Sequence, residues 1–166
     1  NPLCVQNDLR VFFKYVVFTS DEGDDDYLFL LKDDNYLVFV NRSVYLNKSN
    51  DPVLKKLVGG TKLEIPKEGL PWFVDVIENK LGKTEAEGGL PKGKFGCEEE
   101  INGERLIVSR MFGTPGYSFR NHSRRSYLFE DSTDPQDLQL SDELLFEKGL
   151  FEELKKIANK IDNGDL

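Results

Sequence analysis

The sequence has little of the side-chain chemistry that metal centres and nucleophilic active sites use. Its 166 residues include one histidine, His122, and two cysteines, Cys4 and Cys97, with no CxxC pair and no histidine cluster. This scarcity excludes a conventional zinc site and a disulfide-dense scaffold. A single Cys4–Cys97 bridge stays open, although two free thiols in a reducing compartment are the favoured interpretation. We expect no metal and no cofactor.

Long apolar runs are missing as well. No stretch approaches the roughly 18 apolar residues that a membrane-spanning helix requires, and no charged-then-apolar signal segment is found. The chain begins at Asn1 rather than at methionine, as a trimmed or processed chain would. We therefore expect a cytoplasmic protein, or an organellar one after processing. Secretion is less favoured, although Asn41, Asn47 and Asn121 each lie in an Asn-x-Ser triplet.

Catalytic signatures are equally scarce. His122 lies between an asparagine and a serine in an arginine-rich turn, and no pattern places it beside Cys97. The three acids of Glu98-Glu99-Glu100 alternate between faces if they lie on a strand, which separates neighbouring carboxylates. A phosphate-cradling glycine loop is not found, because residues 82–93 lack the strand-to-helix context. We expect a protein that is not an enzyme.

What is present is typical of a folded domain with an acidic surface. Hydrophobic residues make up 39% and charged residues 31% of the chain, which predicts one domain over residues 1–166 with a sizeable core. The net charge of −8 opposes contact with nucleic acid. That charge is segregated: residues 105–129 contain five arginines and no acid, so the rest of the chain carries −13.

The first half predicts four strands and a helix. Residues 9–18, 27–32, 36–46 and 61–65 are rich in β-branched and aromatic side chains, and Asp33-Asp34-Asn35 favours a tight turn. Residues 70–81 then place apolar side chains on one helical face, and Gly82 follows as a stop signal. That face is formed by Leu70, Phe73, Val74, Ile77 and Leu81.

The second half repeats this order. Strands at residues 94–101 and 104–111 flank Asn102-Gly103, a strong hairpin signal because both turn positions need positive φ. Further strands are expected at residues 117–120, 126–130 and 138–140. Ser141 is expected to cap a helix and Gly149 to interrupt it near its start, with Leu150, Leu154, Ile157 and Ile161 on its core face.

Short matches between the halves indicate an internal duplication. Residues 63–68 (LEIPKE) resemble 138–143 (LQLSDE), and residues 77–81 (IENKL) resemble 157–161 (IANKI). We predict an α+β fold in which a four-stranded antiparallel sheet followed by a helix occurs twice, with the helices packed on the sheets. The repeat halves span about residues 9–82 and 93–162.

The acid-free segment is the main candidate for function, because guanidinium groups bind phosphates and exposed aromatic rings stack on unpaired bases. A second group of lysines near the end of the first sheet would assist. The alternative interpretation places the aromatics in the core, as alternation at residues 117–119 suggests, and pairs the arginines with this chain's many carboxylates. The candidate nucleic-acid-binding residues are Arg105, Arg110, Phe112, Tyr117, Arg120, Arg124, Arg125, Tyr127, Lys55, Lys56, Lys62 and Lys67.

The two strand-to-helix junctions, at residues 63–68 and 138–143, carry a resemblance to a known group of folds. The order of elements resembles the Whirly family and its relatives, the positive cofactor four coactivators, the Pur-alpha group and the kinetoplast guide-RNA-binding proteins. The resemblance implies two curved sheets packed by two helices, with single-stranded nucleic acid bound across the sheet surface. The lysine- and glycine-rich Whirly motif is not recognisable in this sequence.

Two functional classes follow. In the first, the chain is a non-catalytic, transcription-regulator-like domain that binds single-stranded DNA or RNA through residues 105–129. In the second, it is an acidic protein-interaction or regulatory module that docks a basic protein partner and does not bind nucleic acid. Neither class involves a membrane.

Overall fold

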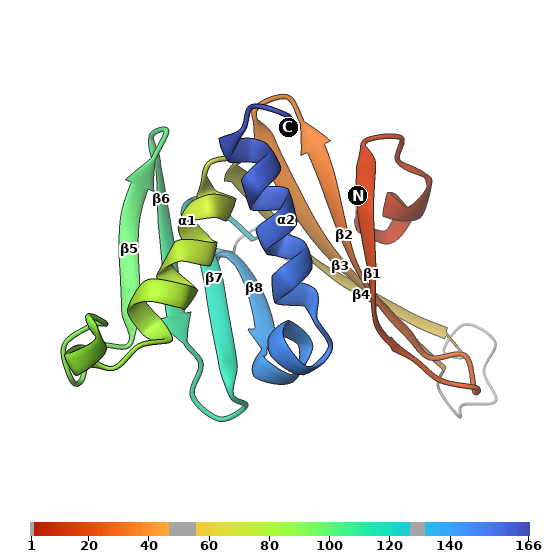
Figure 1. Cartoon of the computed structure of the whole chain (residues 1–166). Helices are drawn as coiled ribbons and strands as arrows, with labels where there is room; N and C mark the ends of the chain where they lie inside the picture. The colour runs from red at the N-terminus through yellow and green to blue at the C-terminus, as the bar shows by residue number, and fades with distance from the viewer. Residues whose placement is uncertain (1, 47–55, 127–131) are drawn as a thin grey trace. The chain divides into compact units, whose positions relative to one another are not determined.

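The computed structural model describes residues 2–46, 56–126 and 132–166, with the backbone alone described for residues 2–4 and 56–58. Within these residues, eight strands form two antiparallel sheets, and each sheet is followed by a helix (Figure 1). The strand order is β1-β2-β3-β4 in one sheet and β5-β6-β7-β8 in the other. The predicted α+β fold and its internal repeat are therefore confirmed.

The first sheet consists of β1 (Val11–Thr19), β2 (Asp25–Asp33), β3 (Tyr36–Leu46) and β4 (Lys56–Pro66). The second consists of β5 (Gly96–Ile101), β6 (Glu104–Arg110), β7 (Gly116–Arg125) and β8 (Pro135–Ser141). The helices are α1 (Gly69–Asp75), continued by π-helical turns η2 (Val76–Leu81), and α2 (Leu150–Asp162), preceded by η4 (Glu143–Glu147). Short 3₁₀ helices lie at η1 (Pro2–Asn7) and η3 (Glu85–Glu87). None of these helices, within the described ranges, is long and apolar enough to cross a membrane.

The chain divides into two compact units, Asn1–Leu63 and Glu64–Leu166. The boundary falls inside β4, so most of that strand belongs to the first unit and its last three residues to the second. Helix α1 follows the first sheet in sequence but belongs to the unit of the second sheet. The repeat in the sequence and the compact units therefore have different boundaries.

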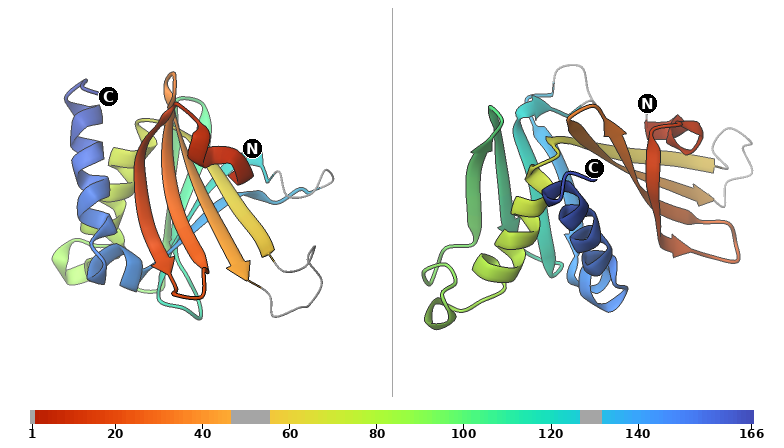
Figure 2. Two further views of the ribbon diagram at one scale, coloured as in Figure 1. Left: turned by 90° about the vertical axis from the view of Figure 1, so that its right-hand side faces the viewer. Right: turned by 45° about the horizontal axis from the view of Figure 1, so that its top comes forward.

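The first unit is built around β2 and β3. Four consecutive residues in each strand, 28–31 and 37–40, are buried, so both faces of these two strands are covered. On one face, Val5 of η1 packs on Phe29, Leu31 and Val40. Figure 2 shows η1 lying against this sheet. The edge strand β1 alternates between half-buried and exposed side chains, as expected of a strand with one wetter face.

The second unit has its core between the sheet and two helices that lie side by side and run in opposite directions (Figures 1 and 2). Leu70 and Phe73 of α1 and Leu150 and Leu154 of α2 are at most 1% exposed. Ser141 caps the turn that precedes α2, because its Oγ accepts a hydrogen bond from the Leu144 N–H at 3.1 Å. Gly149 then breaks the helix with a φ of +83°, as predicted.

The predicted hairpin in this unit is confirmed. Asn102 and Gly103 have φ values of +49° and +79°, the left-handed pair that a type I′ turn requires. The strand expected at residues 117–120 is longer, because β7 continues through residues 121–125, where polar side chains bond to neighbouring strands. The separate strand expected at 126–130 falls almost wholly outside the described residues, and residue 126 is not in a strand.

Candidate functional site

The second sheet has one face covered by helices and one that no described element of its own unit covers. Phe119 in β7 marks the covered face, because its ring stacks on Phe73 of α1 with 4.6 Å between centroids. Side chains alternate along a strand, so Ser118 and Arg120 point to the opposite face. We call this opposite surface the open face.

Two rows of side chains cross the open face. The strand register places Gly96, Ser109, Ser118 and Gln139 in one row and Glu98, Ile107, Arg120 and Asp137 in the next. The first row has small or polar side chains, and a shallow groove of about 510 Å³ lies along it. On its floor, the Ser118 hydroxyl donates a hydrogen bond to Asp137 Oδ1 at 2.6 Å.

Two phenylalanines form one wall of this groove. Phe112 is 84% exposed and Phe95 is 53% exposed. Their rings meet edge to face, with 5.7 Å between centroids. The two rings are inclined at 71° to each other, so each offers its own face, beside a polar floor, on which a planar ring can stack.

Phe95 was not among the residues selected from the sequence, although the hairpin at Asn102-Gly103 contained the signal. Counting back along both strands from that turn pairs Gly96 with Ser109, as the structure has it. The next pair is Phe95 with Arg110, and Arg110 N–H donates to the Phe95 carbonyl at 2.8 Å. The register of the hairpin therefore brings Phe95 next to the segment that contains Phe112.

Two of the candidate arginines lie on the open face in exposed ion pairs. Arg105 Nη2 donates to Glu98 Oε2 at 2.9 Å, and this pairing holds the pKa of the Glu98 carboxyl below its usual range. Arg120 Nε lies 3.7 Å from Asp137 Oδ1. The side chains of these four residues are between 29% and 55% exposed, so water screens both pairs.

Arg110 and Tyr117 lie at the end of β6 and the start of β7, where they contact each other. The Arg110 guanidinium lies 4.5 Å from the centre of the Tyr117 ring and donates to Asp142 Oδ1 at 3.0 Å. Tyr117 is only 3% exposed, and burial raises the pKa of its phenol. Its ring is part of the core and has no free face for a nucleic-acid base.

Arg124 belongs to a polar network at the strand ends. Its guanidinium donates to Glu104 Oε1 at 2.8 Å and to Glu64 Oε2 at 3.2 Å. The hydrogen bonds to Glu104, followed by the charge of Glu104 and Glu64, raise the pKa of Arg124. Asn121, fully buried, donates to Glu104 and to the Glu64 carbonyl, and Gln136 Oε1 accepts from the Glu64 N–H at 2.8 Å. Arg124 is therefore a structural residue.

The remaining candidates are dispersed. Arg125 is exposed and has no ion pair among the described residues. Lys67 donates to the backbone oxygen of Leu166 at 3.3 Å, and Lys62 lies in the first unit. Lys55 and Tyr127 lie outside the described residues, and of Lys56 only the backbone is described. The lysines expected to act together are not brought together by any described contact.

Most of these arginines are paired with carboxylates and Tyr117 is buried. Both observations agree with the alternative interpretation of the sequence, in which the arginines form ion pairs and the aromatic rings lie in the core. Phe112 and Arg125 are exposed, so their side chains are accessible, as the nucleic-acid-binding interpretation requires. Phe112, Arg120 and Arg110 line the groove, whereas Tyr117 and Arg124 do not.

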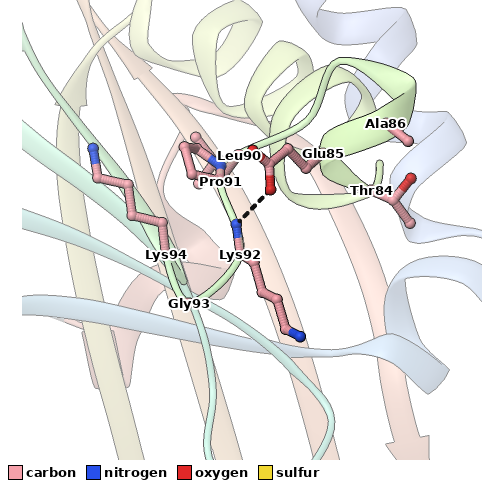
Figure 3. Close-up of a pocket in the computed structure, with 8 residues that line it drawn as sticks. All are labelled: Thr84, Glu85, Ala86, Leu90, Pro91, Lys92, Gly93 and Lys94. Atoms are coloured by element: carbon pink, nitrogen blue, oxygen red, sulfur yellow. Dashed lines mark hydrogen bonds between the residues drawn. The ribbon is translucent and has the colours of Figure 1, made fainter.

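A second hollow, of about 680 Å³, lies in the loop before β5 and is lined by Thr84, Glu85, Ala86, Leu90, Pro91, Lys92, Gly93 and Lys94 (Figure 3). Glu85 Oε2 accepts from the Lys92 N–H at 3.2 Å.

Cys97 lies in β5, three residues after Lys94. It is a free thiol on the helix-covered face, and burial raises its pKa.

Comparison of the chain with protein-family models, with curated proteins and with solved structures gave no match in any of the three.

Proposed function

We propose that this protein binds single-stranded nucleic acid on the open face of its second sheet, without catalysis. The observation that supports the proposal best is Phe112, which is 84% exposed beside Phe95 and above a groove with arginines at its rim. Phe95 immediately precedes β5 and Phe112 lies between β6 and β7, and two exposed aromatic rings in contact are more informative than a single exposed apolar residue. The twofold ββββα order is also the arrangement for which the resemblance to the Whirly family implies binding across the sheet.

The ring faces of Phe95 and Phe112 suit unpaired bases. A base in a duplex has both faces covered by its neighbours, so only a single strand can place a base against these rings. Stacking of this kind contributes about 1–3 kcal/mol per base. The hydroxyl and amide groups of Ser109 and Gln139 on the groove floor would face the polar edge of the stacked base.

The arginines on the open face supply the charge. Arg105 and Arg120 are paired with carboxylates, but exposed pairs of this kind are worth only about 0–1 kcal/mol. A phosphate can therefore replace Glu98 or Asp137 as the partner at little cost. The whole-chain charge of −8 opposes binding at long range, which predicts modest affinity. The phosphate contacts of the arginines predict that the remaining affinity weakens as salt is raised.

A fluorescence-anisotropy titration with a labelled single-stranded oligonucleotide, at two salt concentrations, tests the proposal. We expect binding at the lower salt that weakens steeply at the higher one, and weaker binding to a duplex of the same sequence. Phe112→Ala should weaken binding by about 5- to 150-fold, the range that corresponds to one stacked base. Leu9→Ala is the control, since Leu9 is a fully exposed apolar residue in the first unit.

A second pair of variants separates local charge from net charge. Arg120→Gln removes a cation from the groove rim, and Lys156→Gln removes one from α2, on the helix side of the same unit. Both variants have the same net charge, so equal losses would mean that binding is not localised on the open face. No oligonucleotide binding at low salt, together with co-purification of a basic protein, would instead support the acidic protein-interaction module.

A further inference from the structure

The loop that precedes β5 carries a group of cations that the sequence pattern did not bring out. Residues 80–94 contain the four lysines Lys80, Lys83, Lys92 and Lys94 and only two acids. Lys92 and Lys94 are exposed and make no ion pair among the described residues. Figure 3 shows their ammonium groups extending in different directions from the turn at Gly93, so they would contact two separate anions rather than one.

The two acids of this loop are engaged with the loop itself. Glu87 accepts hydrogen bonds from the Thr84 N–H at 2.8 Å and the Thr84 hydroxyl at 2.9 Å, and these bonds lower its pKa. Glu85 accepts from the Lys92 N–H. Both carboxylates are thus held by loop donors, while the ammonium groups of Lys92 and Lys94 are directed into solvent.

The lysines lie next to the groove because of the chain path. Lys94 is the last residue that lines the loop hollow, and Phe95 is the first that lines the groove. Two backbone hydrogen bonds fix this junction, from Lys94 N–H to the Pro91 carbonyl at 3.0 Å and from Arg110 N–H to the Phe95 carbonyl at 2.8 Å. Figure 1 shows the loop with η3 at the end of the sheet where β5 begins.

We propose that Lys92 and Lys94 extend the binding surface beyond the sheet, and that they contact two backbone phosphates of the strand whose bases stack on Phe95 and Phe112. This inference rests on the proposed function. It identifies the ligand at the loop hollow as the sugar–phosphate backbone of a single strand several nucleotides long, because the lining contains two lysines and no aromatic ring, and its one acid, Glu85, accepts a hydrogen bond from the Lys92 N–H. A mononucleotide would occupy the groove alone.

The salt dependence of binding measures the number of phosphate contacts that the protein makes. For single strands, each phosphate contact contributes about 0.7 to the slope of log Kobs against log salt concentration. The double variant Lys92→Gln/Lys94→Gln should therefore lower the slope by about 1.4. Between 50 and 200 mM salt, the affinity of the wild type should fall about sevenfold more than that of the double variant.

The matched control is Lys156→Gln/Lys160→Gln, which removes two exposed charges from α2 and leaves the same net charge. We expect its slope to equal that of the wild type, and circular dichroism to show all three proteins folded alike. Wild-type binding with an unchanged slope in the Lys92/Lys94 variant would overturn this inference and leave the proposed function standing. Failure of the wild type to bind any single strand at low salt would overturn both.

Discussion

Arg124 and Arg125 are neighbours in β7, yet they have different surroundings. The first shares its guanidinium between Glu104 and Glu64, next to the fully buried Asn121. The second is exposed and unpaired within the described residues. Sequence position alone does not distinguish them, because the distinction depends on which carboxylates the strand register and the end of β4 bring near.

Replacing each arginine in turn separates these roles. Arg124→Ala should lower the free energy of unfolding by about 1–3 kcal/mol, because Glu104 and Glu64 lose a charged donor in a partly buried site. Arg125→Ala should change it by no more than about 0.5 kcal/mol. Urea denaturation followed by circular dichroism measures both. Equal effects would contradict the structural role assigned to Arg124.

The thiol of Cys97 should report on the packing of the helix-covered face. Burial raises its pKa, so the folded state favours the protonated thiol. The resulting stabilisation is complete below the unfolded-state pKa of about 8.5 and is lost as pH rises through the folded-state value. At pH 8, Cys97 should react more slowly with a thiol reagent in the native protein than in urea, as peptide mass spectrometry can measure. Equal rates would contradict the burial.

Helix α1 is the element whose placement matters most. It ends the first repeat in the sequence but packs on the second sheet, where Phe73 stacks on Phe119. Figure 1 shows α1 and α2 on one face of that sheet, and the adjoining turns η2 and η4 contact its strands. The open face is left as the surface of this unit on which a ligand can lie flat.

Truncation of Phe73, one ring of the Phe73–Phe119 stack, tests this arrangement. Phe73→Ala should lower the free energy of unfolding by about 3–5 kcal/mol, because the ring is 1% exposed and leaves a cavity when removed. Phe112→Ala removes the same side chain from the open face and should change stability by less than about 0.5 kcal/mol. Thermal unfolding of the two variants provides the comparison, and similar melting temperatures would show that Phe73 is not in the core.

The elements with strong local signals were predicted well from the sequence. The Asn102-Gly103 turn, the Ser141 cap and the Gly149 break each depend on a backbone conformation or a short-range hydrogen bond. Residues 121–125 were missed as part of a strand, because their polar side chains lack the usual β pattern and are stabilised by contacts with distant residues. Which of the two sheets α1 packs on likewise depends on contacts between residues that are far apart in the sequence.

The candidate site was predicted in part for the same reason. Composition marked residues 105–129 as distinctive, and Phe112 proved exposed. Alternation already suggested that Tyr117 faces inward. Ion pairs such as Arg105 with Glu98 require the hairpin register, and the lysines at 92 and 94 lie outside the segment that composition selected.

At the scale of the whole molecule, the charge of −8 acts on any polyanion through solvent. Charges separated by more than a screening length, about 10 Å at 0.1 M salt, have little influence on each other. The net charge should therefore affect binding at low salt only, while contacts in the groove should matter at all salt concentrations.

Glu152→Lys tests this separation. Glu152 is 70% exposed on α2, on the helix side of the second unit, and the substitution changes the net charge from −8 to −6. We expect tighter oligonucleotide binding at 20 mM salt and no change at 200 mM, whereas the loss caused by Phe112→Ala should persist at both. An improvement that survives high salt would place the strand near α2 instead.

The boundary between the two compact units has a consequence for dissecting the protein. Because the boundary falls within β4, there is no loop at this point for a protease to cut. Glu64, the first residue after it, is bonded through its N–H, its carbonyl and its carboxylate to Gln136, Asn121 and Arg124. A recombinant fragment that contains the second sheet should therefore begin before Glu64. One that begins after Pro66 would leave Asn121 and Gln136 without these partners.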